Sequence, residues 1–193
     1  MTILLLSGSP SIPSRSTRLL HHVGDRLAKL GHRVAKLHVL DLPAEALLQA
    51  DFNNADIKLA KVQVAQADAV VVATPVYKAA YSGALKAFLD VLPQDGFTGK
   101  LVLPLATGGS QSHMLALDYA LRPVLSALGA KQILPSIYAT DAQLSWNASS
   151  GLVLDPAIDQ RVGEGVAHLS AALNTVCTPQ FTPVPFSQVR CSV

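Results

Sequence analysis

Short apolar runs alternate along this chain with longer amphipathic stretches, and this alternation restricts the fold more than any other feature. Runs rich in Val, Leu, Ile and Ala predict five β-strands, at residues 3–6, 33–40, 69–74, 101–106 and 133–138. Helical periodicity predicts helices near residues 16–30, 57–66, 82–92, 113–128 and 158–173. Gly31 and Gly129 lie where helix C-caps are expected. Alternating strands and helices form a parallel sheet with helices on both faces, so we expect one doubly wound α/β domain.

The C-terminal residues lack this pattern. Residues 178–185 include three prolines in seven residues and show no periodicity. We therefore expect one domain over residues 1–175 and a Pro-rich tail over residues 176–193. The tail is expected to be either an extended arm or a disordered end. The two cysteines, Cys177 and Cys191, lie in this part of the chain. We interpret them as ordinary thiols, because disulfides are rare in the cytosol.

Composition narrows the classes of partner. The chain of 193 residues can bury one sizeable core, and 15% of its residues are charged. Globular chains average about 25%, so we expect a homo-oligomer that covers some apolar surface. A net charge of +2 with scattered Lys and Arg does not indicate nucleic acid or a membrane surface. No apolar run approaches the roughly 20 residues of a spanning helix, and a signal peptide's basic start is missing, so we expect a cytoplasmic protein.

The first predicted strand ends in a hydroxyl-rich segment that opens a helix. Residues 7–17 combine serines and a threonine with Gly8 and Arg15. Free N–H groups at a helix start, hydroxyl donors and a guanidinium together suit a phosphate dianion. The alternative is that the hydroxyls only cap the helix and form turns, which is their default role. Neither G-x-x-x-x-G-K-[ST] nor G-x-G-x-x-G follows this strand, which disfavours a triphosphate loop and a dinucleotide turn.

Two further strand ends carry unusual segments. Residues 74–83 contain a strand-breaking Pro75 with Tyr77 and Tyr81, and residues 107–113 contain Gly108 and Gly109. Ligands of doubly wound sheets bind at the carboxyl ends of the strands, near the switch in winding direction. Backbone donors and aromatic edges beside a phosphate pocket form a slot for a flat heteroaromatic ring, and FMN fits it best. The alternative is a plain glycine turn with two surface tyrosines.

Residues 73–86, 103–110 and 118–128 closely resemble the NADPH-dependent FMN reductases, in particular the reductase components of two-component alkanesulfonate monooxygenase systems. The resemblance covers residue 1 to about residue 134 and weakens beyond residue 140. It implies a flavodoxin-like fold with a five-stranded parallel sheet in the order 2-1-3-4-5. It also implies that NAD(P)H passes a hydride to FMN, and that the reduced flavin leaves for a partner monooxygenase. That partner releases sulfite from organosulfonates during sulfur starvation.

The resemblance also implies which residues bind the cofactor. The phosphate would contact Ser9, Arg15 and Ser16, and the two sides of the ring would be lined by Pro75, Val76, Tyr77 and Ser82, and by Thr107, Gly108, Gly109 and Ser110. The family's phosphate loop often reads G-S-x-R-x-x-S, whereas here an extra Ile12 and Pro13 precede Ser14. Hydride transfer occurs between the two cofactors, so no acid–base pair is required.

Three single residues complete the predicted site. His113 is expected at a helix start or at the cofactor edge, with proton donation as the alternative. Asp41 ends the second strand, where a Rossmann protein binds ribose, but without the glycine fingerprint the simpler interpretation is a solvated strand end. Pro123 cannot donate to the carbonyl of Tyr119, so the helix should be irregular there. In the family this tyrosine marks a π-type bulge at a subunit interface, which implies control of flavin release; interface packing is the alternative.

Two other functions share this pattern. A quinone or azo reductase would retain its FMN, and a flavodoxin-type electron carrier would not be an enzyme. Such carriers tend to be acidic, so the slightly basic charge favours an enzyme. No cluster of His, Cys, Asp and Glu has metal spacing, so we predict no metal. The sequence ties no arginine to a 2′-phosphate, so NADPH and NADH both stay open as the hydride donor.

Overall fold

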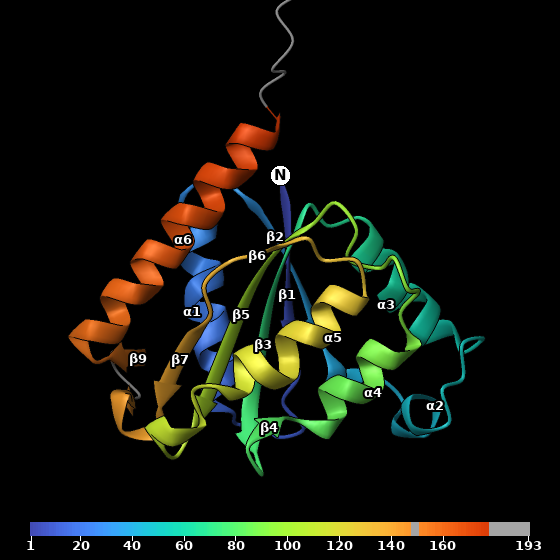
Figure 1. Ribbon diagram of the computed structural model, residues 1–193, viewed down its shortest axis with the longest axis horizontal. Helices are drawn as coiled ribbons and strands as arrows, with labels where there is room; N and C mark the ends of the chain where they lie inside the picture. The colour runs from blue at the N-terminus through green and yellow to red at the C-terminus, as the bar shows by residue number, and fades with distance from the viewer. Residues whose placement is uncertain (148–150, 178–193) are drawn as a thin grey trace, which may run out of the picture.

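The computed structural model describes residues 1–147 and 151–177 and is built on a parallel sheet (Figure 1). Its strands are β1 (Thr2–Ser7), β2 (Arg33–His38), β3 (Ala69–Tyr77), β5 (Leu101–Gly108), β6 (Gln132–Ile133) and β7 (Ile137–Thr140). The order is β2-β1-β3-β5-β6, and β7 also pairs with β5 in parallel. Because β6 and β7 follow one another along β5, they are two halves of the predicted fifth strand. The predicted flavodoxin-like order 2-1-3-4-5 is therefore confirmed.

Helices cover both faces of this sheet, as the sequence predicts. On one face lie α1 (Arg15–Lys29) and α6 (Pro156–Cys177), which pack on Ile3 and Leu5 of β1. On the other face lie α2 (Ala44–Leu48), α3 (Ala55–Ala65), α4 (Gly83–Val91) and α5 (Arg122–Ala127), which share a core with Leu4 and Leu6. Successive strand residues point to opposite faces, so one buried strand serves both cores. No helix in the described part is long and apolar enough to cross a membrane.

The predicted helix over residues 113–128 is instead three short pieces. These are a 3₁₀ turn η2 (Gln111–His113), a π-helical segment η3 (Leu117–Leu121) and α5. Pro123 has no N–H for the carbonyl of Tyr119, so the register of hydrogen bonds widens there. The predicted irregularity at Tyr119 is confirmed.

Three predicted strands have different ends. Pro135 interrupts the fifth strand, because proline cannot donate to the ladder. The second strand stops at His38, and Val39–Asp41 form the 3₁₀ turn η1. Pro75 does not break β3, which continues to Tyr77, so that expectation was wrong. The carbonyl of Ala73 accepts from the N–H of Gly8 at 2.8 Å, so Ala73 faces the β1 side of the strand. Pro75 lies two residues further on and faces the same side. Because β1 has already ended there, the missing N–H of the proline leaves no hydrogen bond unmade.

The short elements were not expected from the sequence. They are α2, β4 (Ala80–Tyr81), which folds back onto β3, the turn η4 (Asp141–Gln143), and a hairpin of β8 (Leu144–Asn147) and β9 (Gly151–Leu154). Each is too short to show a periodicity. Helix α6 continues through Cys177, two residues into the predicted tail. The rest of that tail, with Cys191, lies outside the described residues.

Candidate functional site

The hydroxyl-rich loop between β1 and α1 is shaped by its own serines. Ser14 caps α1: its Oγ accepts from the N–H of Thr17 at 3.4 Å and lies 2.9 Å from the buried Oγ of Ser16. The buried Ser9 hydroxyl donates to the carbonyl of Ser11 and accepts from its N–H, both at 3.3 Å. The first-turn N–H groups of Arg15 and Ser16 have no carbonyl within the helix. They lie at the positive end of α1, where an anion is favoured.

Arg15 is 56% exposed, and its Nη1 lies 3.5 Å from Oδ2 of Asp141, which is 42% exposed. Asp141 directly follows β7, so the last strand of the sheet places a carboxylate beside the loop that follows the first. Sequence reasoning missed this partner. Its signal was that Asp141 comes just after the predicted fifth strand, and carboxyl ends of parallel strands meet at one edge.

The second predicted segment follows β3. Val76 pairs with Tyr81 and Tyr77 with Ala80, which leaves the Tyr77 side chain half exposed at the end of a tight hairpin. Ser82, predicted to line the ring, is fully buried. Its hydroxyl donates to the carbonyl of Gly8 and accepts from the N–H of Leu85 at 3.1 Å. Ser82 thus joins the first loop to the start of α4 and presents no hydroxyl outward.

The third predicted segment is held against β7. Gly108 leaves room for its neighbours, because a Cβ there would lie 2.5 Å from Oη of Tyr138 and 3.3 Å from Cβ of Val76 and would displace the Tyr138 side chain. Tyr138 Oη donates to the carbonyl of Ser110 at 2.7 Å, and burial raises the pKa of this phenol, which keeps it a donor. Thr107 is buried, whereas a Cβ on Gly109 would meet no atom within 4 Å. The backbone at Gly109 is therefore open to a ligand.

The sheet brings the three segments together. Pro75 pairs with Thr107 across β3 and β5, and Ser82 bonds Gly8 at the end of β1. His113 is half-buried in η2, and η3 packs beside β4 and β5. Tyr119 in η3 is 79% exposed. The structure thus places the predicted residues at one edge of the sheet, while their contacts with a cofactor stay predictions.

Comparison with known proteins identifies the family. The model of the NADPH-dependent FMN reductase family matches residues 1–144. An FMN reductase (NADPH) of Escherichia coli K12 is 50% identical over 144 residues, 75% of each chain, and one of Pseudomonas putida KT2440 is 44% identical over 174 residues, 90% of this chain and 88% of the relative. The apo crystal structure of the NADH:FMN oxidoreductase EMOB superposes with a TM-score of 0.80 at 39% identity, over 89% of each chain. This chain therefore belongs to the NADPH-dependent FMN reductase family of oxidoreductases.

Proposed function

We propose that this chain transfers a hydride from NAD(P)H to free FMN and releases the reduced flavin to a partner monooxygenase. The balanced reaction is NADPH + H⁺ + FMN → NADP⁺ + FMNH₂. The observation that carries the proposal is the meeting of three segments at one sheet edge: the hydroxyl-rich loop with Arg15, the hairpin with Tyr77, and the open backbone at Gly109.

The residues present fit FMN in chemistry. The N–H groups of Arg15 and Ser16 and the Arg15 guanidinium are donors for its phosphate oxygens. Backbone groups around Gly109 can read the donors and acceptors of the ring edge, since no side chain crowds them. When bound, the flavin supplies the redox chemistry. The chain binds and orients the two cofactors and keeps their reacting faces aligned.

The open surroundings of the site support release of the flavin. Arg15 and Tyr77 are half exposed and Tyr119 is 79% exposed, so no described residue of this chain closes over them. In this proposal Tyr119, carried by the π-helical η3, controls how long the flavin stays. The side chains of Tyr77, Met114, Leu115 and Tyr119 are each exposed, which leaves apolar surface on the segments that follow β3 and β5. A homo-oligomer that buries this surface would place the flavin near a subunit boundary.

The further fate of the flavin follows the family resemblance. The partner in this proposal is a flavin-dependent monooxygenase that uses FMNH₂ and O₂ to release sulfite from organosulfonates, which supplies sulfur. The alternatives are a quinone or azo reductase with retained FMN and an electron carrier of the flavodoxin type. A colourless purified protein and a low flavin affinity would separate the reductase from both.

Steady-state NADPH and NADH oxidation, with and without added FMN, tests the proposal. We expect nearly colourless protein whose activity depends on added flavin. We expect Arg15→Ala to raise the KM for FMN, whereas Arg33→Ala, at the opposite end of the sheet, leaves it unchanged. Flavin that copurifies, with quinone reduction faster than FMN reduction, would favour the alternative enzyme. Sulfite release by a monooxygenase supplied with this chain, NADPH and FMN tests the partner.

A further inference from the structure

A cavity of about 360 Å³ lies on the other side of the hydroxyl-rich loop from the predicted flavin ring. Its walls are the loop itself, the first turns of α1 and the end of β2. The predicted ring position adjoins β3 and β5, whereas β2 lies on the opposite side of β1. The cavity therefore borders the phosphate loop without using the elements that would hold the flavin ring. Its volume lies in the range of small-ligand sites.

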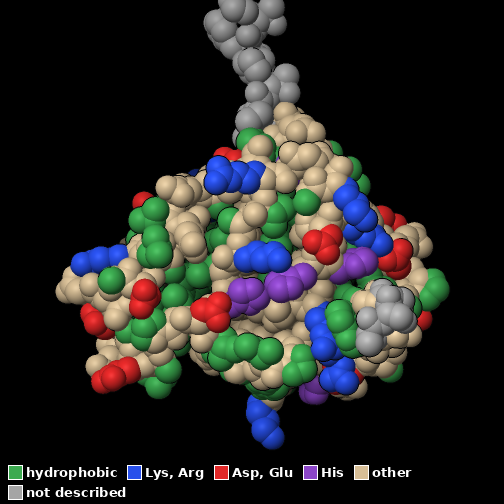
Figure 2. Space-filling view, turned by 180° about the vertical axis from the view of Figure 1, so that it is seen from behind, with side chains coloured by type: hydrophobic (Ala, Val, Ile, Leu, Met, Phe, Trp, Pro, Cys, Tyr) green, Lys and Arg blue, Asp and Glu red, His purple; other side chains and the backbone are tan. Residues whose placement is uncertain are grey.

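Basic side chains gather around this cavity. Arg18, His21 and His38 line it, and the rings of His21 and His38 meet edge to face with their centres 5.3 Å apart. The Arg18 guanidinium lies 4.1 Å from the centre of the Trp146 ring and makes no ion pair within residues 1–147 and 151–177. Figure 2 shows histidine, lysine and arginine side chains gathered on one face of the molecule. Arg18 and the two histidines can therefore act as donors to an anion in this cavity, the histidines when they are protonated.

Two further observations specify the chemistry of that anion. Nε2 of His21 is buried and has no hydrogen-bond partner among the described residues, as is also the case for His22, so the His21 ring would have to turn to offer this nitrogen to a ligand in the cavity that it lines. Asp41 lines the same cavity at the end of η1. A carboxylate after the second strand accepts ribose hydroxyls in dinucleotide-binding proteins, and a nearby arginine accommodates a ribose phosphate. The cavity is thus lined both by a carboxylate that can accept from a ribose hydroxyl and by side chains that can donate to a phosphate.

We propose that this cavity binds the phosphorylated ribose of a nucleotide, with Arg18, His21 and His38 on the phosphate and Asp41 on a ribose hydroxyl. The inference rests on the proposed function, because NADPH brings such a group as its 2′-phosphoadenosine end. The same chemistry could come from a 5′-phosphate, as in the adenosine half of FAD. The structure thus supplies the arginine for a 2′-phosphate that the sequence alone does not identify.

Proton uptake should accompany binding. Burial lowers the pKa of His21, and electrostatic interactions with Lys36 and His38 lower it further, while Asp25 raises it. The ring is thus largely neutral at neutral pH, and Arg18 and Asp41 are the charged groups that line the cavity with it. A bound phosphate dianion favours the protonated ring, so His21 should strengthen binding as the pH falls toward 6.

Calorimetric titration of the full chain with 2′,5′-ADP tests the proposal, with 5′-AMP as the second arm. We expect Arg18→Gln and His21→Gln each to weaken binding of 2′,5′-ADP by about tenfold or more, the usual effect of losing a hydrogen bond to a charged group. The gain in affinity from pH 8 to pH 6.5 should be smaller in His21→Gln. In steady state, Arg18→Gln should raise the KM for NADPH and leave that for NADH unchanged.

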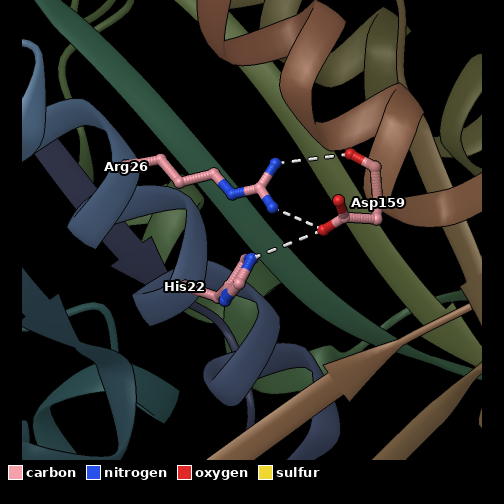
Figure 3. Close-up of polar contacts among 3 residues, drawn as sticks. All are labelled: His22, Arg26 and Asp159. Carbon is pink, nitrogen blue, oxygen red and sulfur yellow. Dashed lines mark hydrogen bonds and ion pairs between the residues drawn. The ribbon is translucent and has the colours of Figure 1, made fainter. Parts of the chain in front are cut away.

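His22→Gln is the matched control. His22 is the next residue of α1, but it points to α6, where its Nε2 lies 3.9 Å from Oδ1 of Asp159 (Figure 3). Arg26 contacts the same carboxylate and donates to the Asp159 carbonyl at 3.3 Å. His22→Gln removes a histidine from the same helix without touching the cavity, so 2′,5′-ADP should bind it as it binds the wild type.

Each outcome decides a separate point. Binding of 2′,5′-ADP that exceeds that of 5′-AMP assigns the site to NADPH, whereas equal binding with the same dependence on Arg18 overturns that source. No binding of either nucleotide, or equal weakening by His22→Gln, overturns the site itself. Thermal melting of each variant shows whether the fold is intact, because FMN affinity is no independent check where Ser9 of the predicted phosphate site also lines the cavity. A wild type that binds 2′,5′-ADP but not FMN would contradict the proposed function and leave this site standing.

Discussion

Asp141 sets a limit on how tightly the loop can hold a phosphate. Its carboxylate lies 3.5 Å from the Arg15 guanidinium, and both side chains are about half exposed. An ion pair of this kind contributes about 0–1 kcal/mol. When Arg15 turns to a phosphate, it gives up that pair, and the carboxylate repels the incoming dianion. Asp141→Asn removes both effects, so FMN should bind up to about fivefold more tightly, the equivalent of about 1 kcal/mol.

Quenching of flavin fluorescence at low and high salt measures this change. The effect should shrink at high salt, because exposed charges are screened. Asp90→Asn is the matched control: it removes an exposed carboxylate paired with Lys86 on α4, without reaching the loop. In an Arg15→Ala background only the repulsion of the dianion remains, so Asp141→Asn should change the affinity less, as a double-mutant cycle reports. Weaker FMN binding by Asp141→Asn, or an equal effect of Asp90→Asn, would refute the reasoning.

Four further predictions concern packing, release and pH. Ser82→Ala removes a helix cap and a donor to Gly8, so urea unfolding should show a loss of about 1–3 kcal/mol, against little change for the exposed Ser112→Ala. Gly108→Ala should destabilise by about 1–3 kcal/mol because its Cβ meets Tyr138, whereas Gly109→Ala should not. Tyr119→Ala should purify yellow because it slows release; unchanged flavin retention would contradict the role of Tyr119. Burial lowers the pKa values of His21, His22 and His32, so the unfolded chain takes up protons first as the pH falls below about 6.5 and thermal stability drops there. Changing all three to Gln should flatten that drop, as melting at pH 7.5 and 5.5 would show.

The sequence predicts the layers of this fold well because burial dictates them. Strands such as β1 and β3 are buried on both faces and read as continuous apolar runs, and Gly31 and Gly129 adopt the positive φ of 87° expected after helices. Short elements escape prediction, since two to five residues show no period. The prediction that Pro75 ends β3 was wrong because a proline is tolerated in a strand where the neighbouring strand has already ended.

The candidate site is predictable in its location but not in its contacts. Strand ends locate the three segments, because parallel strands share one carboxyl edge. The Arg15–Asp141 pair joins residues more than a hundred positions apart, and the sequence shows that Asp141 comes just after a predicted strand but not that it meets Arg15. For Ser82, the sequence predicts the position at the start of a helix, but it does not predict that packing against Gly8 buries the side chain. Hydroxyls that look available in a sequence are partly used by the loop that carries them.

The face of the sheet covered by α1 and α6 has a consequence for synthesis. Side chains of α6, from Ile158 to Leu173, complete the core that Val71 and Leu103 begin. A nascent chain that has emerged only as far as β7 still lacks this cover, and its apolar face stays exposed to solvent until the residues from Asp141 to Leu173 have also left the ribosomal tunnel. Chaperone capture during translation should therefore concentrate on that interval, well after the flavin edge has been made.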